Sequence, residues 1–486
     1  MEPALRPSKR RPDQFKRSDS GNAELFSAIC RHHLRFDHSK QQWFHYRGHW
    51  WSLDVDGKLM RLAKLAMRLR LHSSSHISDV DKRKEEAKWA LQSESLPRLE
   101  AMLKLARSEK LLADDGRNWD SDPWLLGVAN GVVDLRTGNL RPGTPEDRIT
   151  LHTDISFDPE AQCPRWMRLL SEVFNGDPDL ISYVRRAVGY SITGETCEQC
   201  FFCCYGDGAN GKSTFLNAIR HVLGGYASNL PFSAFELTAR STISNDVATL
   251  PGKRFVTAIE TDESARLNEA RIKALTGGDI LTARPLYREF FEFKPVAKFW
   301  LAFNHRPLVT DETHGFWRRV HLIPFVRQFD PKSDTKLEET LSAEAPGILA
   351  WAVRACVEWQ EKGATPPTLV QAATQAYRTE SDPLRDFVEE RCISEPKAEV
   401  SVGDLRAAYV LWVNENSEGK VLARPELTRR LEAMGYQKRR SGRARTWTWF
   451  GIRLRGDYDC LTPATSEPPP AAGTADVRTD ADVKLQ

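Results

Sequence analysis

A short glycine-rich segment, Gly206–Thr214, carries the residue types that bind phosphate groups. It fits the pattern of a glycine, four further residues and then Gly-Lys-Ser/Thr. Glycines let backbone N–H groups curl around a phosphate, and a helix that follows adds positive partial charge. We expect Lys212 to reach the β- and γ-phosphates of a nucleotide and Ser213 to bind Mg²⁺. The expected phosphate-binding residues are Gly206, Asp207, Gly208, Ala209, Asn210, Gly211, Lys212, Ser213 and Thr214.

Acidic residues follow a second apolar run, Phe255–Ile259. A site that hydrolyses nucleotides needs a carboxylate at the end of a neighbouring strand to hold the metal and activate water. Glu260 is the first candidate and Glu263 the second, with Asp262 between them. The sequence leaves open which acid binds metal and which polarises water, and a solvated acidic strand end is the alternative.

Two further signals follow along the chain. The run Lys298–Phe303 ends in Asn304, whose amide could orient the attacking water, although asparagine is also common in turns. Arg318 and Arg319 come next. In a ring, one of them could reach the γ-phosphate of the neighbouring subunit as an arginine finger, and an ordinary surface pair is the alternative.

Short apolar strands must position these groups. Phe201–Tyr205 leads into the glycine-rich segment, and Phe215–Leu223 leaves it with the spacing of an amphipathic helix. Strands and helices then alternate, which predicts a parallel α/β sheet. The four cysteines at 197, 200, 203 and 204 lack a second metal-binding pair at finger spacing, so we interpret them as core thiols.

The ordered set from Gly206 to Arg319 resembles superfamily 3 helicases, an AAA+ group of viral and plasmid replication proteins. It is most similar to the phage and plasmid primase–helicase branch, which includes the poxvirus helicase–primase. Gly206–Thr214 matches the first motif, Phe255–Glu260 the second and Asn304 the sensor. The additional motif of the branch is similar to Lys273–Asp279 and Thr282–Tyr287, and the domain that precedes the ATPase is similar to Asn130–Gly138 and Gly189–Gly194.

This resemblance implies a ring, hexameric in the family, that moves 3′→5′ along single-stranded DNA. It also implies a hairpin that enters the central pore between the second and third motifs. The basic candidates for DNA phosphates there are Lys273, Arg284, Arg288 and Lys294. The alternative is that these charges only solvate the hairpin.

Many relatives carry a primase domain ahead of the helicase, and here only about 120 residues precede the part nearest the ATPase. Asp54 and Asp56 resemble the Asp-x-Asp pair of polymerising primases, but Gly57 makes a turn the simpler interpretation. We therefore do not expect primase activity.

A basic segment lies near the carboxyl end. Two expected helices, Val402–Asn414 and Pro425–Met434, precede a basic hairpin and the strand Trp447–Leu454, an order typical of a winged helix. No acid lies between Gln437 and Arg455, which favours DNA contact over a plain solvated surface. Trp449 and Trp447 would pack the wing or stack. The expected DNA-binding residues are Lys438, Arg439, Arg440, Arg443 and Arg445.

Composition sets the outer limits. The chain has 486 residues, a net charge of +3 and no apolar run long enough to span a membrane. The expected fold is an α/β P-loop AAA+ ATPase core with an α+β amino-terminal domain and a carboxyl-terminal winged helix. The expected segments are a disordered basic tail (1–22), an α+β domain (23–160), a helical collar (161–195), the AAA+ domain (196–350), a helical linker (351–383), the winged helix (384–456) and a disordered acidic tail (457–486).

The combined hypothesis is a replicative DNA helicase of a phage, plasmid or other mobile element that uses ATP and Mg²⁺. Its expected partners are single-stranded and forked DNA, further copies of itself and a separate primase or polymerase, in the cytosol of a bacterium or phage-infected host and without a membrane. The alternative is a DNA-binding AAA+ initiator or maintenance protein that uses ATP to switch assembly without processive unwinding.

Overall fold

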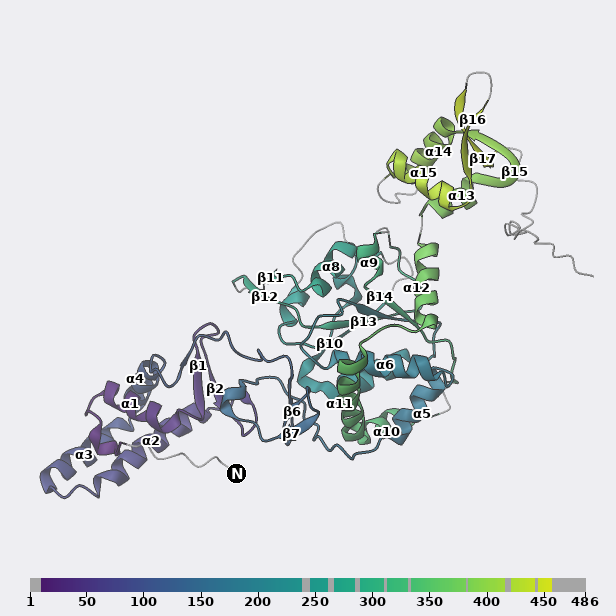
Figure 1. Cartoon of the computed structure of the whole chain (residues 1–486). Coiled ribbons are helices and arrows are strands. Elements are labelled where there is room, and N and C mark those ends of the chain that lie inside the picture. The colour runs from purple at the N-terminus through teal and green to yellow at the C-terminus, as the bar shows by residue number, and fades with distance from the viewer. Residues whose placement is uncertain are drawn as a thin grey trace, which may run out of the picture. The chain divides into compact units, whose positions relative to one another are not determined.

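The computed structural model describes residues 10–237, 245–260, 266–284, 289–309, 313–330, 334–381, 383–415, 421–441 and 445–456 (Figure 1). The chain divides into two units, Met1–Ser381 and Asp382–Gln486. Both mix helices with strands, so the protein is of the mixed α/β kind. Within the described ranges, no helix is long and apolar enough to cross a membrane.

The first part of unit 1 packs four helices beside a small sheet ordered β3-β2-β1-β4. Buried Arg70 joins three of these helices, because it donates to Glu86 Oε1 at 2.6 Å and to Asn22 Oδ1 at 2.8 Å. A buried guanidinium without such partners would be strongly destabilising. The elements are α1 (Asp19–Cys30), β1 (Leu34–Asp37), β2 (Gln42–Tyr46), β3 (Trp51–Leu53), α2 (Lys58–Ser74), α3 (Val80–Ser93), α4 (Leu96–Ala106) and β4 (Ala113–Asp114).

A three-stranded antiparallel sheet follows, formed by β5 (Leu125–Val128), β6 (Gly131–Asp134) and β7 (Asn139–Arg141). Arg254 fixes this sheet against the next part of the unit. Its buried guanidinium donates to the carbonyl oxygens of Leu125 at 2.8 Å and Ile192 at 3.0 Å.

The central sheet of unit 1 has five parallel strands in the order β14-β8-β13-β10-β9. Strands β8, β10 and β13 confirm the three predicted strands, and their residues are nearly all buried because helices cover both faces. The strands are β8 (Phe201–Tyr205), β9 (Ala227–Asn229), β10 (Phe255–Ile259), β13 (Lys298–Phe303) and β14 (Val320–Pro324).

Helices α6 and α11 lie on one side of this sheet, and α8 and α9 lie on the other (Figure 1). One core gathers Trp166, Phe215 and Trp300, while the core on the other face gathers Leu275, Leu301 and Phe316. The helices are α5 (Pro164–Val173), α6 (Pro178–Ser191), α7 (Lys212–Leu223), α8 (Glu269–Gly277), α9 (His314–Trp317), α10 (Leu337–Ala343), α11 (Ala345–Lys362) and α12 (Thr368–Glu380).

Two features of this packing differ from the segments drawn on the sequence. Helices α5 and α6, expected as a separate collar, contribute buried side chains to the same core as the sheet. Helix α11 continues through residue 350, where the nucleotide domain was expected to end. The reason is that both α6 and α11 cover one face of the central sheet, so their apolar sides share its interior.

A short antiparallel hairpin, β11 (Leu281–Ala283) with β12 (Phe291–Phe293), lies between β10 and β13 in the chain. Ala283 is buried against the second core, whereas Phe290 is 53% exposed. The hairpin is therefore anchored at its base.

Unit 2 has the element order helix, strand, helix, helix, strand, strand, and its sheet has the order β15-β17-β16. Helices α14 and α15 and strand β17 confirm predicted elements. Strand β15 was not predicted because it contains Pro396, at a shift of register between Ser394 and Glu399. The elements are α13 (Pro383–Arg391), β15 (Cys392–Ser401), α14 (Val402–Glu415), α15 (Arg424–Ala433), β16 (Gln437–Ser441) and β17 (Thr446–Leu454).

Candidate functional site

The glycine-rich segment forms the loop between β8 and α7, at the carboxyl edge of the central sheet. Two of its glycines are required by close neighbours. A Cβ on Gly206 would lie 2.1 Å from the carbonyl oxygen of Phe325, and one on Gly211 would lie 2.9 Å from Val173 Cγ2. Both have positive φ, +151° and +83°, a region that favours glycine.

Lys212, the first residue of α7, turns back into the loop and is 6% exposed. Its ammonium donates to the carbonyl oxygen of Gly206, to Asn210 Oδ1 at 3.0 Å and to Asn304 Oδ1 at 3.0 Å. Burial lowers the pKa of Lys212, and the surrounding oxygens supply partners for its charge. The lysine thus joins the loop to the end of β13.

The loop is also fastened to the segment that follows β14. Asn210 Nδ2 donates to the carbonyl oxygen of Phe325 at 3.0 Å, and the Phe329 N–H donates to the carbonyl oxygen of Ala209 at 2.7 Å. At the end of β14 itself, the Phe325 N–H donates to the carbonyl oxygen of Tyr205 at 2.7 Å. Two hydrogen bonds therefore fix the loop to this stretch of chain, and a third fixes the end of β8 just before the loop.

Glu260 and Asn304 lie at the same edge, because β10 and β13 run parallel to β8 and end beside it. The Glu260 N–H donates to the carbonyl oxygen of Ala302 at 2.9 Å, which continues the ladder past the last strand residue. The structure thus brings together the loop, Lys212, Glu260 and Asn304. Glu263 and Asp262 lie outside the described residues.

The chemistry of this edge fits a magnesium ion. Mg²⁺ prefers oxygen ligands and keeps several waters, so it needs only one or two protein oxygens beside the phosphates of its nucleotide. The Ser213 hydroxyl is exposed and Glu260 is half-buried, so oxygen donors are available. Over the described residues, no cluster of three or more histidines, cysteines, aspartates or glutamates forms a separate metal site.

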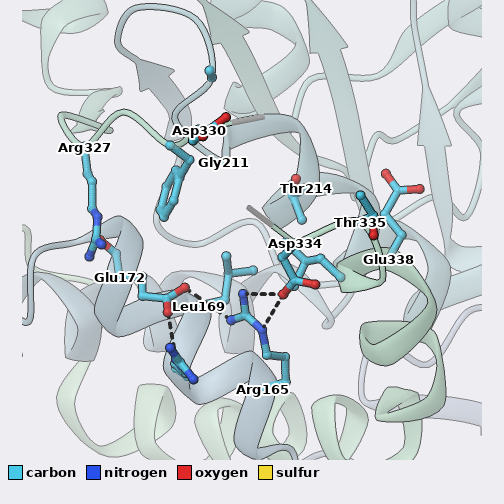
Figure 2. A pocket seen from close by; sticks show the side chains of 14 residues that line it. Arg165, Leu169, Glu172, Gly211, Thr214, Arg327, Asp330, Asp334, Thr335 and Glu338 are labelled. Carbon is cyan, nitrogen blue, oxygen red and sulfur yellow. Dashed lines mark hydrogen bonds and ion pairs between the residues drawn. The ribbon is translucent and has the colours of Figure 1, made fainter. Parts of the chain in front are cut away.

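A cavity of about 590 Å³ opens beside the loop, on the side of α5 and α10 (Figure 2). Figure 2 shows Gly211 and Thr214 on one wall and the ion pairs of Arg165 on another. Arg165 contacts Asp334 at 3.1 Å and Glu172 at 3.3 Å. The lining residues are Arg165, Arg168, Leu169, Glu172, Ala209, Gly211, Thr214, Arg327, Phe329, Asp330, Asp334, Thr335, Leu337 and Glu338.

Sequence reasoning missed most of this cavity and also missed Arg306. The guanidinium of Arg306 lies 4.5 Å from the ring centroid of Tyr205, the residue before the loop, and pairs with Glu380 in α12. Its position two residues after Asn304 was the available signal. Arg306 thus adds a guanidinium, paired with a carboxylate, at the edge that carries the glycine-rich loop and Asn304.

Arg318 and Arg319 lie at the opposite, amino edge of the sheet. The Phe201 N–H donates to the carbonyl oxygen of Arg319 at 2.9 Å, so the pair precedes β14 where β8 begins. Arg318 is exposed and donates to Gln199 Oε1 at 2.6 Å, whereas Arg319 bonds the Gly315 carbonyl and burial lowers its pKa. A five-residue strand, about 13 Å long, separates the pair from the loop of the same chain.

The candidate hairpin residues take different environments. Arg284 is exposed, with its guanidinium 5.0 Å from the ring centroid of Phe290, and Lys294 is also exposed. Lys273 is half-buried and donates to Thr313 Oγ1 at 3.2 Å. Arg288 lies outside the described residues.

In unit 2, Lys438, Arg439 and Arg440 lie on β16, with Arg439 and Arg440 exposed, and Arg445 is exposed just before β17. Arg443 lies outside the described residues. The two tryptophans of β17 differ sharply. Trp449 is 1% exposed and packs in the core of the unit, whereas Trp447 is 48% exposed.

Two other sequence features have structural explanations. Asp54 accepts hydrogen bonds from the backbone N–H groups of Lys58 and Leu59 and so caps α2, while Asp56 pairs with Arg61 at 3.2 Å. Cysteines 203 and 204 are buried in β8, and burial raises the pKa of each thiol. Such thiols behave as small apolar groups.

Two stretches of the chain match models of protein families. Residues 23–175 match the family model described as D5 N terminal like, and residues 204–319 match a family of unknown function. A solved structure, the C-terminal region of NrS-1, aligns with 85% of this chain and 86% of that one at 12% identity and a TM-score of 0.46.

Among curated proteins, a mimivirus protein of Acanthamoeba polyphaga, provisionally named a helicase, is 30% identical over 331 residues, which is 63% of this chain and 34% of that protein. A frog virus 3 protein, also provisionally named a helicase, is 27% identical, and the match covers 63% of this chain and 40% of that protein. A provisionally named primase of African swine fever virus is 26% identical and covers 71% and 39%. The chain spans 34% to 40% of the length of these relatives. The match of the amino-terminal region and these viral relatives make the chain similar to primase–helicase proteins of phages and viruses.

Proposed function

We propose that the chain is an ATP-dependent replicative DNA helicase of a phage, plasmid or other mobile element, acting in the cytosol of the host cell. The observation that carries the proposal is the contact between Lys212 and Asn304 at the edge where Glu260 and the glycine-rich loop gather. A P-loop lysine, a strand-end carboxylate and a polar sensor are the parts that nucleotide hydrolysis requires. The all-parallel strand order supports an AAA+ core.

In this proposal the phosphates of ATP replace the oxygens that now surround Lys212. The backbone N–H groups of the loop and the amino end of α7 would hold the phosphates, and the cavity beside α5 would take the nucleoside. Ser213 and Glu260 would hold Mg²⁺, which neutralises charge on the phosphates when it is bound. Asn304 would orient the attacking water, and either Glu260 or Glu263 would polarise it.

The positions of the two arginines support assembly into a ring. Arg318 and Arg319 are one strand length from the loop of their own chain, so neither can contact a nucleotide bound there. A neighbouring copy could present its loop to that edge, which supports a finger acting between subunits and a hexameric ring. Arg318 is the better finger candidate, because its side chain is exposed, whereas Arg319 is half-buried.

DNA would be contacted at two places. The β11–β12 hairpin would carry Arg284, Arg288 and Lys294 into the pore, with Lys273 at its base, and movement would be 3′→5′ as in the resembling family. The element order of unit 2 supports a winged-helix domain whose basic hairpin contacts phosphates. A separate primase or polymerase is the expected partner, because Asp54 and Asp56 serve as helix-capping groups.

The decisive experiment measures ATP hydrolysis and the unwinding of forked DNA that carries only a 3′ or only a 5′ tail. Lys212→Ala is compared with the wild type, and Lys40→Ala serves as a matched control because it removes a surface ammonium remote from the loop. We expect wild type and control to hydrolyse ATP and unwind the 3′-tailed fork, and Lys212→Ala to do neither. Hydrolysis without unwinding of either fork would favour the initiator or maintenance protein that uses ATP to switch assembly.

A further inference from the structure

The hairpin of unit 2 carries its charge and its aromatic groups on one face. Arg440 pairs with Trp447 across the β16–β17 ladder, and Lys438 pairs with Trp449 two residues further along. Directly opposed residues in a sheet project to the same side, so these four side chains share a face. Trp449 is buried in the core of the unit, whereas Trp447 is exposed.

Trp447 is therefore a large aromatic ring left on the surface with cations beside it. Lys438 Nζ lies 5.3 Å and the Arg440 guanidinium 5.1 Å from its ring centroid. Within the described ranges no carboxylate pairs with Lys438, Arg439 or Arg440, and the chain has no acid from Met434 to Gly456. The hairpin thus presents a ring face and uncompensated positive charge together.

Single-stranded nucleic acid matches this combination best. A base has a flat face that stacks on an aromatic ring, and its flanking phosphates accept hydrogen bonds from lysine and arginine. The bases of an intact duplex are stacked on one another and offer no face to Trp447 along their length. An acidic peptide would satisfy the cations but would leave the ring in water.

We propose that Trp447 stacks on an unpaired base while Lys438 and Arg440 contact the adjacent phosphates. Hairpin recognition is thereby selective for single strands and for the unpaired arms of a fork. This inference rests on the proposed function as a DNA-binding protein and specifies which form of DNA the carboxyl-terminal unit reads. In the free protein the two cations lie against the Trp447 ring and keep it oriented. When a strand binds, they move from the ring to the phosphates, and a base takes their place on the ring.

Photo-crosslinking of the full chain to an oligonucleotide containing 5-iodouracil tests the stacking directly. Trypsin cleaves after Arg445 and Arg453, so a single peptide, Thr446–Arg453, contains both tryptophans. We expect mass spectrometry to locate the crosslink on Trp447 and not on buried Trp449. A blunt duplex of the same sequence should give at least tenfold less crosslink in this peptide.

Affinity measurements supply the second readout. Trp447→Ala should weaken single-strand binding about tenfold, the loss of one stacked base, and change blunt-duplex binding less than twofold. Trp447→Phe should retain most of the affinity. Lys438→Gln with Arg440→Gln should lower the slope of log K against log salt by about 1.4 on single strands. Lys397→Gln, on the far strand of the same sheet, should change neither quantity appreciably.

Two results would overturn the inference. One is DNA binding whose crosslinks bypass the Thr446–Arg453 peptide. The other is an equal loss of single-strand and duplex affinity in Trp447→Ala. Neither result would contradict the proposed helicase function, provided that ATP hydrolysis and unwinding still depend on Lys212. A wild-type chain that binds neither DNA form would instead contradict the proposed function itself.

Discussion

The edge of the central sheet that carries the glycine-rich loop is called the nucleotide edge after its proposed ligand. This edge in unit 1 and the basic hairpin in unit 2 both concentrate positive charge, but they hold it in opposite ways. Lys212 is 6% exposed and has four oxygen atoms within hydrogen-bond distance. Arg440 is exposed, with an aromatic ring beside it. A buried ammonium must be matched atom by atom, which suits one ligand in one geometry. An exposed cation tolerates many geometries, which suits a DNA strand whose phosphates move past it.

The largest expected effect tests whether the nucleotide edge is complete within one chain. Arg318→Ala should lower ATP turnover about 10³-fold if Arg318 completes the site of a neighbouring subunit. Lys212→Ala should be equally inactive alone. Mixing the two inactive variants should restore part of the activity. In a mixed ring, some interfaces join an intact Lys212 of one subunit to an intact Arg318 of its neighbour.

Turnover measured against the mixing ratio of the two variants checks this expectation. Arg354→Ala is a suitable control, since it removes an exposed arginine of α11 that bonds the Pro159 carbonyl, remote from β14. Mixtures that stay inactive at every ratio would contradict the expectation. The arginine finger would then act within its own chain or be another residue, and the nucleotide edge, like the hairpin, would need no second subunit.

The next prediction compares the two tryptophans of β17. Trp449→Ala should lower the free energy of unfolding of unit 2 by about 3–5 kcal/mol, because it removes a fully buried aromatic side chain. Trp447→Ala should change it by less than about 0.5 kcal/mol, as exposed substitutions usually do. Chemical denaturation followed by circular dichroism measures both. Equal effects would mean that Trp447 serves packing and not recognition.

A smaller effect separates the two regions by pH. His321 lies near the amino end of β14 in the central sheet of unit 1, with its Nδ1 hydrogen-bonded to the Tyr183 hydroxyl, and burial lowers its pKa to about 4. The unfolded chain binds a proton at this histidine near pH 6.5, whereas the folded chain does not bind it until about pH 4. Stability is therefore fully present above pH 6.5 and falls as pH drops toward 4, by up to about 3 kcal/mol.

His321→Gln keeps an acceptor for Tyr183 and removes the titration. The variant should lose less stability than the wild type between pH 6.5 and 4, as judged by denaturant midpoints across that range. His38→Gln is the control, because His38 is in the amino-terminal part, where its ring bonds the Arg107 carbonyl and packs against Phe36. An unchanged pH profile in His321→Gln would assign the acid sensitivity to carboxylates instead.

The sequence indicated which residues gather at this edge of the sheet because the signals are local. Glycine spacing, an apolar strand and a polar residue at the strand end each lie within a few positions, as Gly206, Glu260 and Asn304 do. The cavity could not be predicted from the sequence. Its residues Arg165 and Asp334 form an ion pair although they are 169 positions apart, and no sequence pattern links them. Strand β15 was hidden by Pro396 and its irregular pairing.

The fates of Trp447 and Trp449 show the same limit at short range. They are two positions apart on one strand and share a face, so their alternation pattern is identical. Only burial distinguishes them, because Trp449 packs in the core of the unit and Trp447 does not. That difference is a property of the packed unit and leaves no mark in the local sequence.

Strand β14 has a consequence for how successive subunits of the proposed ring would influence one another. Its amino end holds Arg319 against β8, and its carboxyl end continues into Phe325 and Phe329, which bond the glycine-rich loop. Both ends are pinned to the same neighbour, so β14 is too short and too tightly paired to stretch. Any shift of the loop on filling or emptying would thus displace the arginines at the far edge. The presence of nucleotide in one subunit would then affect the next subunit of the ring through the five residues of β14.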